Sequence, residues 1–212
     1  MHARALAAYQ DEHLAERYRA RVARVAAAEK AKAPGMSGLT PAVADAYRKL
    51  LMVKDEYEVA RLYSDGRFAA EVAARFEGVR AISFHMSPPL LGPRDASGRP
   101  RKIRLSGWWV SPALRLLARM KGLRGTWVDP FGYLAERRAD QAAIAEYERL
   151  LDEIAERLTP ATHATAVALA ALPLEVKGYG HVKAASRARI ETQQAALLAR
   201  LREGDTARVA AQ

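Results

Sequence analysis

The most informative feature of this 212-residue chain is what it lacks, and cysteine comes first, because the sequence contains none. The chain therefore forms no disulfide bond and supplies no thiolate to a zinc ion or an iron–sulfur cluster. Long apolar runs are missing too. The best candidate, residues 164–172, ends at Pro173 and falls short of the about 20 apolar residues that span a bilayer. We therefore expect a cytoplasmic protein without a membrane segment.

Aromatic residues are scarce, at 7% of the chain, whereas half of the residues are hydrophobic. This composition indicates a helix-rich globular protein rather than a disordered one. Acidic residues do not balance the basic ones, and the formal net charge is +10. Such a charge fits a nucleic-acid partner, an acidic protein partner, or a basic composition without a binding role. Because acidic residues are interspersed among the arginines, we favour a solvated surface and expect no nucleic-acid partner.

Apolar residues recur at the three- and four-residue spacing of amphipathic helices along most of the chain. The pattern predicts helices at about residues 3–30, 41–63, 67–76, 112–121, 133–158, 161–172 and 182–202. Gly122 is predicted to end one of them in the left-handed conformation. Gly204 is predicted to end the last helix, which leaves residues 205–212 as a frayed tail.

One region has a different pattern. Between residues 79 and 86, Ile82, Phe84 and Met86 alternate with other residues, as in a half-buried strand. A turn signal follows at residues 95–98, and a second short strand pattern follows at 102–105. The sequence thus predicts a small antiparallel β-hairpin at about 79–105. The predicted fold is mainly α (α+β), with one helical domain over residues 1–204 into which the hairpin is inserted.

A glycine-containing segment, KGYGHVK at residues 177–183, is the most function-like local pattern. Gly178 and Gly180 allow close approach of a ligand to the backbone, and His181 and Lys183 lie at the predicted start of the last helix. The free amides of that helix and the charge of Lys183 favour a phosphate or carboxylate. The segment fits neither a Walker A loop nor GxGxxG. A plain helix connector explains it equally well.

The hairpin carries a second basic pattern, RPRK at residues 99–102. Arg99, Arg101 and Lys102 are candidates for contacts with a partner. Without an aromatic stacking platform, the pattern is a weak indication of nucleic-acid binding. We prefer the interpretation that these charges protect an edge strand from pairing with another chain.

Catalytic and metal-binding patterns are not recognisable. The five histidines are scattered, and no Gly-x-Ser-x-Gly segment is present. Asp55 and Glu58 have the spacing of neighbouring carboxylates on a helix, but ion pairing with Lys54 and Arg61 explains them better than a metal. Asp129, before Pro130, is first of all a turn former or a helix cap. We therefore assign no catalytic residue and no metal ligand.

Five segments occur in this chain in the same order as in a known protein family. KDEYEVARLYSDGRF, FHMSPPLL, GRPRK, GLRGTWVDPFGYLAERR and KGYGHVK occur at residues 54–68, 84–91, 98–102, 122–138 and 177–183. Together they resemble the C-terminal region of the large, fused bacterial indolepyruvate ferredoxin oxidoreductases. The N-terminal AYQDEHLAERYRARV is similar to the segment that joins this region to the catalytic domain. The resemblance covers nearly the whole chain.

The resemblance implies oxidation of arylpyruvates such as indolepyruvate to the acyl-CoA, with thiamine diphosphate, iron–sulfur clusters and ferredoxin. This chain has no GDG-type thiamine motif, no dinucleotide loop and no cysteine, so it resembles the accessory module and not the catalytic part. We expect it to pack on the catalytic portion, in the same chain or as a separate subunit, and to shape access for CoA or ferredoxin. The alternative is a freestanding basic helical module that binds nucleic acid or an acidic protein.

Overall fold

The computed structural model describes residues 1–86, 92–93, 101–178 and 180–210. These residues form helices and one two-stranded antiparallel sheet, so the predicted mainly α fold with a small hairpin is confirmed. In the described ranges, no helix is both long and apolar enough to cross a membrane. Where the sequence predicted one domain over 1–204, the residues group into two compact units. Unit 1 is Met1–Val53 with Leu134–Gln212, and unit 2 is Lys54–Tyr133.

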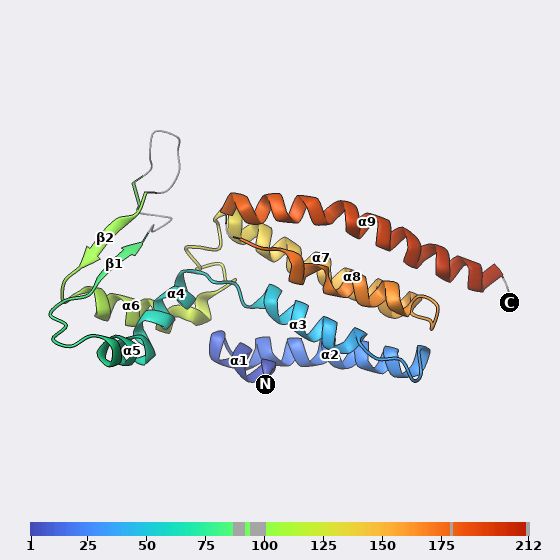
Figure 1. The fold of residues 1–212 in the computed structure, drawn as a ribbon, viewed down its shortest axis with the longest axis horizontal. Coiled ribbons are helices and arrows are strands. Elements are labelled where there is room, and N and C mark those ends of the chain that lie inside the picture. The colour runs from blue at the N-terminus through green and yellow to red at the C-terminus, as the bar shows by residue number, and fades with distance from the viewer. Residues whose placement is uncertain (87–91, 94–100, 179, 211–212) are drawn as a thin grey trace. The chain divides into compact units, whose positions relative to one another are not determined.

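Unit 1 is a helical bundle made from both ends of the chain. Its helices are α1 (His2–Tyr9), α2 (Glu12–Lys32), α3 (Leu39–Leu51), α7 (Ala135–Arg157), α8 (His163–Glu175) and α9 (Gly180–Ala210). In Figure 1 the long helices of this unit, α2, α3, α7, α8 and α9, lie lengthwise side by side. Helix α3 packs on α2, α7 and α8, and α9 packs on α7 and α8. The apolar faces that the sequence predicted are therefore buried between helices that are distant in the sequence.

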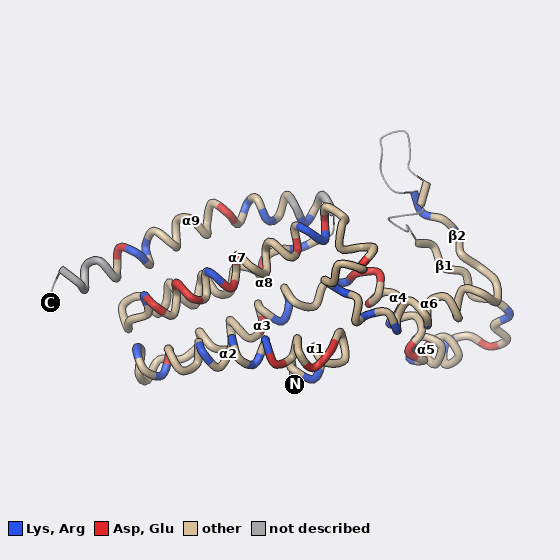
Figure 2. The backbone as a smooth tube through the Cα atoms, turned by 180° about the vertical axis from the view of Figure 1, so that it is seen from behind, with Lys and Arg blue, Asp and Glu red and all other residues tan. Residues whose placement is uncertain are grey.

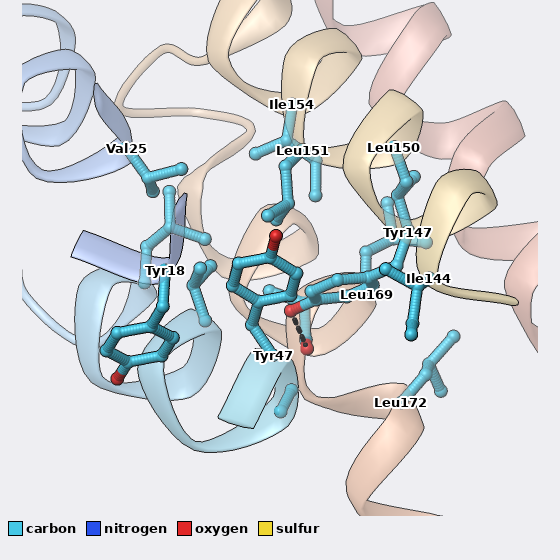
Figure 3. Close-up of a cluster of buried hydrophobic side chains, with 14 of the residues drawn as sticks. Tyr18, Val25, Tyr47, Ile144, Tyr147, Leu150, Leu151, Ile154, Leu169 and Leu172 are labelled. Carbon is cyan, nitrogen blue, oxygen red and sulfur yellow. Dashed lines mark hydrogen bonds between the residues drawn. The ribbon is translucent and has the colours of Figure 1, made fainter. Parts of the chain in front are cut away.

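The core of unit 1 contains 24 buried residues. At its centre three tyrosine rings follow one another: Tyr18 stacks on Tyr47, and Tyr47 lies 6.1 Å from Tyr147, between ring centroids. The Tyr147 hydroxyl donates a hydrogen bond to the carbonyl oxygen of Ala170 at 2.8 Å (Figure 3). Leucines and isoleucines of α7 and α8 surround these rings (Figure 3). Each hydroxyl that enters this core needs such a partner, because an unpaired buried hydroxyl is costly.

A buried carboxylate, that of Glu29, joins the ends of three helices of unit 1. It accepts hydrogen bonds from the amides of Leu39 and Thr40, at 2.9 and 3.0 Å, at the start of α3. The ring Nε2 of His163, the first residue of α8, lies 2.8 Å from Oε1, the same oxygen that accepts from Leu39. Burial opposes ionisation of Glu29, but the hydrogen bonds from Thr40, His163 and Leu39 outweigh it and lower the pKa of Glu29 to about 2.

Two segments predicted as single helices are each broken once, which corrects the predictions for residues 3–30 and 41–63. The breaks lie at Asp11, before α2, and at Asp55, before α4 (Glu56–Ser64). Each carboxylate accepts a hydrogen bond from the amide three residues later, at 2.8 Å in both cases. An aspartate in this position caps a new helix, and it does so without interrupting the apolar spacing on which the predictions were based.

The last helix does not end at Gly204, as predicted, but continues to Ala210. The described backbone of the predicted tail over 205–212 is helical up to Ala210. Gly204 has a packing role instead, because a Cβ atom there would lie 2.8 Å from the Thr162 side chain. One glycine costs a helix only about 1 kcal/mol relative to alanine, which the flanking helix formers tolerate.

Unit 2 contains α4, α5 (Arg67–Arg75), β1 (Ser83–Met86), β2 (Ile103–Ser106), α6 (Val110–Arg119) and the 3₁₀ helix η1 (Met120–Leu123). Helix α4 packs on α5, α6 and η1. The strands pair antiparallel with Phe84 opposite Leu105, which confirms the hairpin, although β1 begins four residues later than predicted. Gly122 lies inside η1, and Gly125, with φ +73°, takes the left-handed conformation that was predicted for Gly122.

Candidate functional site

The predicted anion site lies where α8 ends and α9 begins. Gly178 has φ +89°, and a Cβ atom there would lie 2.4 Å from the Val182 side chain, so only glycine fits this turn. Helix α9 begins at Gly180, and Lys183 belongs to its first turn. The side chain of His181 lies outside the described part of the chain. Of the four predicted residues, the structure thus places the two glycines and Lys183 at one helix start.

Lys183 forms an ion pair within unit 1. Its ammonium group donates a hydrogen bond to Asp140 of α7 at 2.6 Å. The Asp140 side chain is only 7% exposed, and it also lies within 4.0 Å of two guanidinium groups, those of Arg137 at 3.0 Å and Arg187 at 3.9 Å. One carboxylate is therefore shared among three cations, which leaves a local excess of positive charge.

Two further lysines extend this positive region. The ammonium group of Lys49, on α3, donates to the carbonyl oxygens of Leu174 and Val176 at the end of α8, at 2.8 and 2.7 Å. Burial, followed by the positive charges of Lys177 and Lys183, lowers the pKa of Lys49. We call Lys49, Arg137, Lys177, Lys183 and Arg187, together with Asp140, the basic cluster.

Unit 2 holds a buried polar network of a different kind. Arg124 binds Asp55 through two nitrogens, at 2.5 and 2.9 Å, and both side chains are less than 10% exposed. The guanidinium also lies over the ring of Tyr57, 5.3 Å from its centroid. The predicted pairing of Asp55 with Lys54 is therefore replaced by a pairing with a residue 69 positions away, whereas Glu58 pairs with Arg61 as predicted.

Asp129 forms the second half of this network and shapes the loop after η1. Its carboxylate accepts hydrogen bonds from the Tyr57 hydroxyl at 2.9 Å, from the Phe131 amide at 3.0 Å and from the Gly125 amide at 3.1 Å. The prediction that Asp129 is a turn former is confirmed. In the same loop the Tyr133 hydroxyl donates to the carbonyl oxygen of Trp127 at 2.7 Å, which fixes the backbone that carries the Trp127 ring.

The surface of unit 2 is unusually apolar. Trp108, Trp109 and Trp127, the three tryptophans of the sequence, are 88%, 47% and 84% exposed. Helix α5 buries none of its residues, and its apolar face opens on a groove of about 460 Å³. The groove is lined by Ala69, Val72, Ala73, Phe76, Glu77, Gly78, Val79 and Ile82. Exposed apolar surface of this kind marks an interaction site more often than a free surface.

Residues 1–196 match the family of unknown function DUF6537. The chain belongs to this family. No curated protein and no solved structure matches it. The DUF6537 match includes all of unit 2 and the part of unit 1 up to residue 196, with the basic cluster, and it ends inside α9.

The remaining predicted residues of this DUF6537 chain belong to the RPRK segment at 99–102. Arg101 and Lys102 are exposed immediately before β2, while Arg99 lies outside the described residues. No group of three or more histidine, aspartate or glutamate side chains in the described ranges is arranged to hold a metal ion. Lys and Arg alternate with Asp and Glu along both units, in agreement with the interspersed charge of the sequence (Figure 2).

Sequence reasoning missed the central residue of the basic cluster, Asp140, and the outward orientation of the tryptophans. The three-residue spacing of Arg137 and Asp140 was a usable signal for a helical ion pair. Nothing in the sequence indicated that Lys183 would be their neighbour, because that contact joins residues 43 positions apart.

Proposed function

We propose that this DUF6537 chain is a non-catalytic accessory module or subunit of a 2-oxoacid ferredoxin oxidoreductase of the indolepyruvate type. In this proposal unit 2 docks on the thiamine-dependent catalytic portion and helps to shape access for CoA or ferredoxin. Thiamine diphosphate and the iron–sulfur clusters belong to that catalytic portion, because this chain has no cysteine to bind a cluster. The ordered segments that resemble such enzymes support the choice of partner.

The observation that carries the docking proposal is the distribution of exposed apolar side chains. Of the fifteen large hydrophobic side chains that are exposed among the described residues, eleven belong to unit 2. They are Leu62, Tyr63, Phe76, Val79, Ile82, Trp108, Trp109, Leu116, Trp127, Val128 and Tyr133. Aromatic residues are enriched at protein interfaces, and tryptophan is prominent among the residues whose truncation weakens binding most.

The loop that carries Trp127 is suited to docking because its backbone is already ordered. Asp129 accepts hydrogen bonds from two amides of the loop, and Tyr133 binds the carbonyl oxygen of Trp127 itself. The indole ring is nevertheless 84% exposed. A partner that covers this ring pays little conformational entropy, since the loop does not have to be ordered on binding. Two of the segments that carry the resemblance, residues 54–68 and 122–138, thus supply Tyr57 and Asp129 of the network that supports this loop.

The test is capture of the enzyme with the full chain. The tagged chain is incubated with lysate of its source cells, and the eluate is assayed for thiamine-dependent, arylpyruvate-dependent dye reduction. We expect the activity with the wild-type chain and a loss of at least about tenfold with Trp127→Ala, as for an interface hot spot. Met36→Ala changes an apolar residue of unit 1 that is 40% exposed and should retain the activity. An eluate that contains only nucleic acid would favour the freestanding basic module.

A further inference from the structure

The basic cluster of unit 1 has no role in the docking of unit 2, and its chemistry points to a ligand of its own. It contains five cations: Arg137, Lys183 and Arg187 lie within 4.0 Å of the Asp140 carboxylate, and Lys49 lies within electrostatic range of Lys177 and Lys183. They come from α3, α7, the α8–α9 connection and α9, so the fold brings them together from four places in the sequence. Grouping like charges without a counter-charge is unfavourable, and an anion relieves it.

The positions of the lysines suit an anion with several oxygens. Lys183 and Arg187 lie one helical turn apart on α9 and share Asp140. The backbone amide of Lys177 donates to the Ser186 hydroxyl at 3.1 Å, which holds the connection against the same stretch of α9. The Lys177 side chain remains exposed, and the Lys49 ammonium is held beside it through the carbonyl oxygen of Val176.

The start of α9 adds a second source of positive potential. The helix begins at Gly180, directly after the tight turn at Gly178, and Lys183 is in its first turn. The amides of a first helical turn have no partner within the helix and favour an anion. Burial lowers the pKa of Lys49 most, and the positive charges of Lys177 and Lys183 lower it further, in agreement with the grouping of these three ammonium groups.

We propose that the basic cluster is a binding site for the diphosphate group of a small molecule, with Lys177, Lys183 and Arg187 as the principal ligands and Asp140 holding the last two in place. A diphosphate offers the charge and the number of oxygens that several cations at different positions can share. The proposal is independent of the docking surface on unit 2, since it concerns different residues in a different unit.

The experiment is calorimetric titration of the full chain at low ionic strength with pyrophosphate, ADP and inorganic phosphate. We expect pyrophosphate and ADP to bind with similar affinity and phosphate to bind more weakly, because the diphosphate is the recognised group. Saturable binding of ADP without binding of pyrophosphate would assign recognition to the nucleoside and overturn the proposal. Absence of saturable binding of all three anions would overturn it as well.

Variants that each remove one positive charge distinguish binding at the basic cluster from a general effect of the net charge on anion binding. Lys177→Gln and Lys183→Gln should each weaken pyrophosphate binding about tenfold, the loss expected for one charge-assisted hydrogen bond. Lys30→Gln removes the same charge from an exposed position on α2 and should change the affinity less than about twofold. Lys177 is exposed, so its variant should fold even if Lys183→Gln disturbs Asp140. Equal weakening by all three variants would contradict a localised site.

Discussion

The two units of the molecule use their apolar residues in opposite ways. In unit 1 a core cluster of 24 buried residues is shared by six helices. In unit 2 the corresponding cluster has four, Ala60, Phe84, Val110 and Leu114, although the unit spans residues 54–133. Unit 2 also carries most of the exposed large hydrophobic side chains. Unit 1 therefore buries its apolar surface by itself, whereas unit 2 leaves much of its apolar surface exposed.

The units also differ in what holds them together. In unit 1, tyrosine rings and aliphatic side chains fill the spaces between long helices. In unit 2, a buried ion pair and the carboxylate of Asp129 connect α4 to the loop after η1. A small core supplies little free energy of folding, so the stability of unit 2 should depend strongly on this polar network.

The largest effect is expected from breaking the buried ion pair of unit 2. Arg124→Ala leaves the Asp55 carboxylate buried without its bidentate partner and should destabilise unit 2 by about 3–5 kcal/mol. Hydrogen exchange of peptides from residues 54–133 measures the loss. Arg124→Leu combined with Asp55→Asn should recover most of it, because asparagine keeps the helix cap and carries no charge. A single variant that exchanges as slowly as wild type would show that the network is dispensable.

A core truncation in unit 1 should have the next largest effect. Leu169 of α8 is fully buried, so Leu169→Ala should lower the free energy of unfolding by about 3 kcal/mol. Denaturant unfolding followed by circular dichroism measures this change. Leu116→Ala in unit 2 is the control, because Leu116 is 63% exposed and its loss should cost less than about 0.5 kcal/mol. Similar losses from both variants would contradict the proposed difference between the units.

Acid should lower the free energy of unfolding of unit 1, because Glu29 becomes protonated. The pKa of its carboxyl is about 2 in the folded chain and 4.5 in the unfolded reference, so the folded state binds fewer protons between these values. Its contribution is present above about pH 4.5 and is lost as the pH falls toward 2. We expect a loss of about 2–3 kcal/mol over this window. Denaturant unfolding between pH 2 and 6 measures it, and Glu29→Gln should flatten this part of the profile.

The smallest effect on stability is expected at the docking surface. Trp127→Ala removes a ring that is 84% exposed and leaves the backbone hydrogen bond from Tyr133 in place. The free energy of unfolding should change by less than about 0.5 kcal/mol, as for most surface substitutions. The same variant is expected to lose the partner, so retained stability with lost binding would separate the two roles. A large drop in stability would instead make Trp127 a structural residue.

The predictions from sequence succeeded where the information was local. The spacing of Ile144, Leu151 and Ile154 predicted the long helix α7, and the alternation around Phe84 predicted the hairpin. The helix breaks at Asp11 and Asp55 were missed. An aspartate that caps a helix and an aspartate on a helix surface look alike in the sequence, and the backbone conformation at the residue distinguishes them. Gly204 was misassigned for a related reason. Its close approach to Thr162 comes from tertiary packing, whereas its effect on helix propensity is small.

The sequence predicted less of the candidate sites than of the helices and the hairpin. Gly178, Gly180 and Lys183 stood out because glycines before a helix start have a local meaning, and the structure places them together at the start of α9. The other cations of the basic cluster were not connected to them. Lys49 precedes Lys183 by more than a hundred residues, and the packing of both α3 and α9 on α8 brings it near. Contacts of this range depend on the whole fold.

The division of unit 1 into two separate stretches of sequence sets the order in which the molecule can be assembled. Residues 1–53 leave the ribosome with the apolar faces of α2 and α3 uncovered, and all of unit 2 is synthesised before α7 and α8 appear. At about 5–20 residues per second, the 80 residues of unit 2 impose a delay of about 4–16 s. During this interval the nascent chain has a complete unit 2 and half of a bundle, so the faces of α2 and α3 that pack on α7 and α8 stay uncovered.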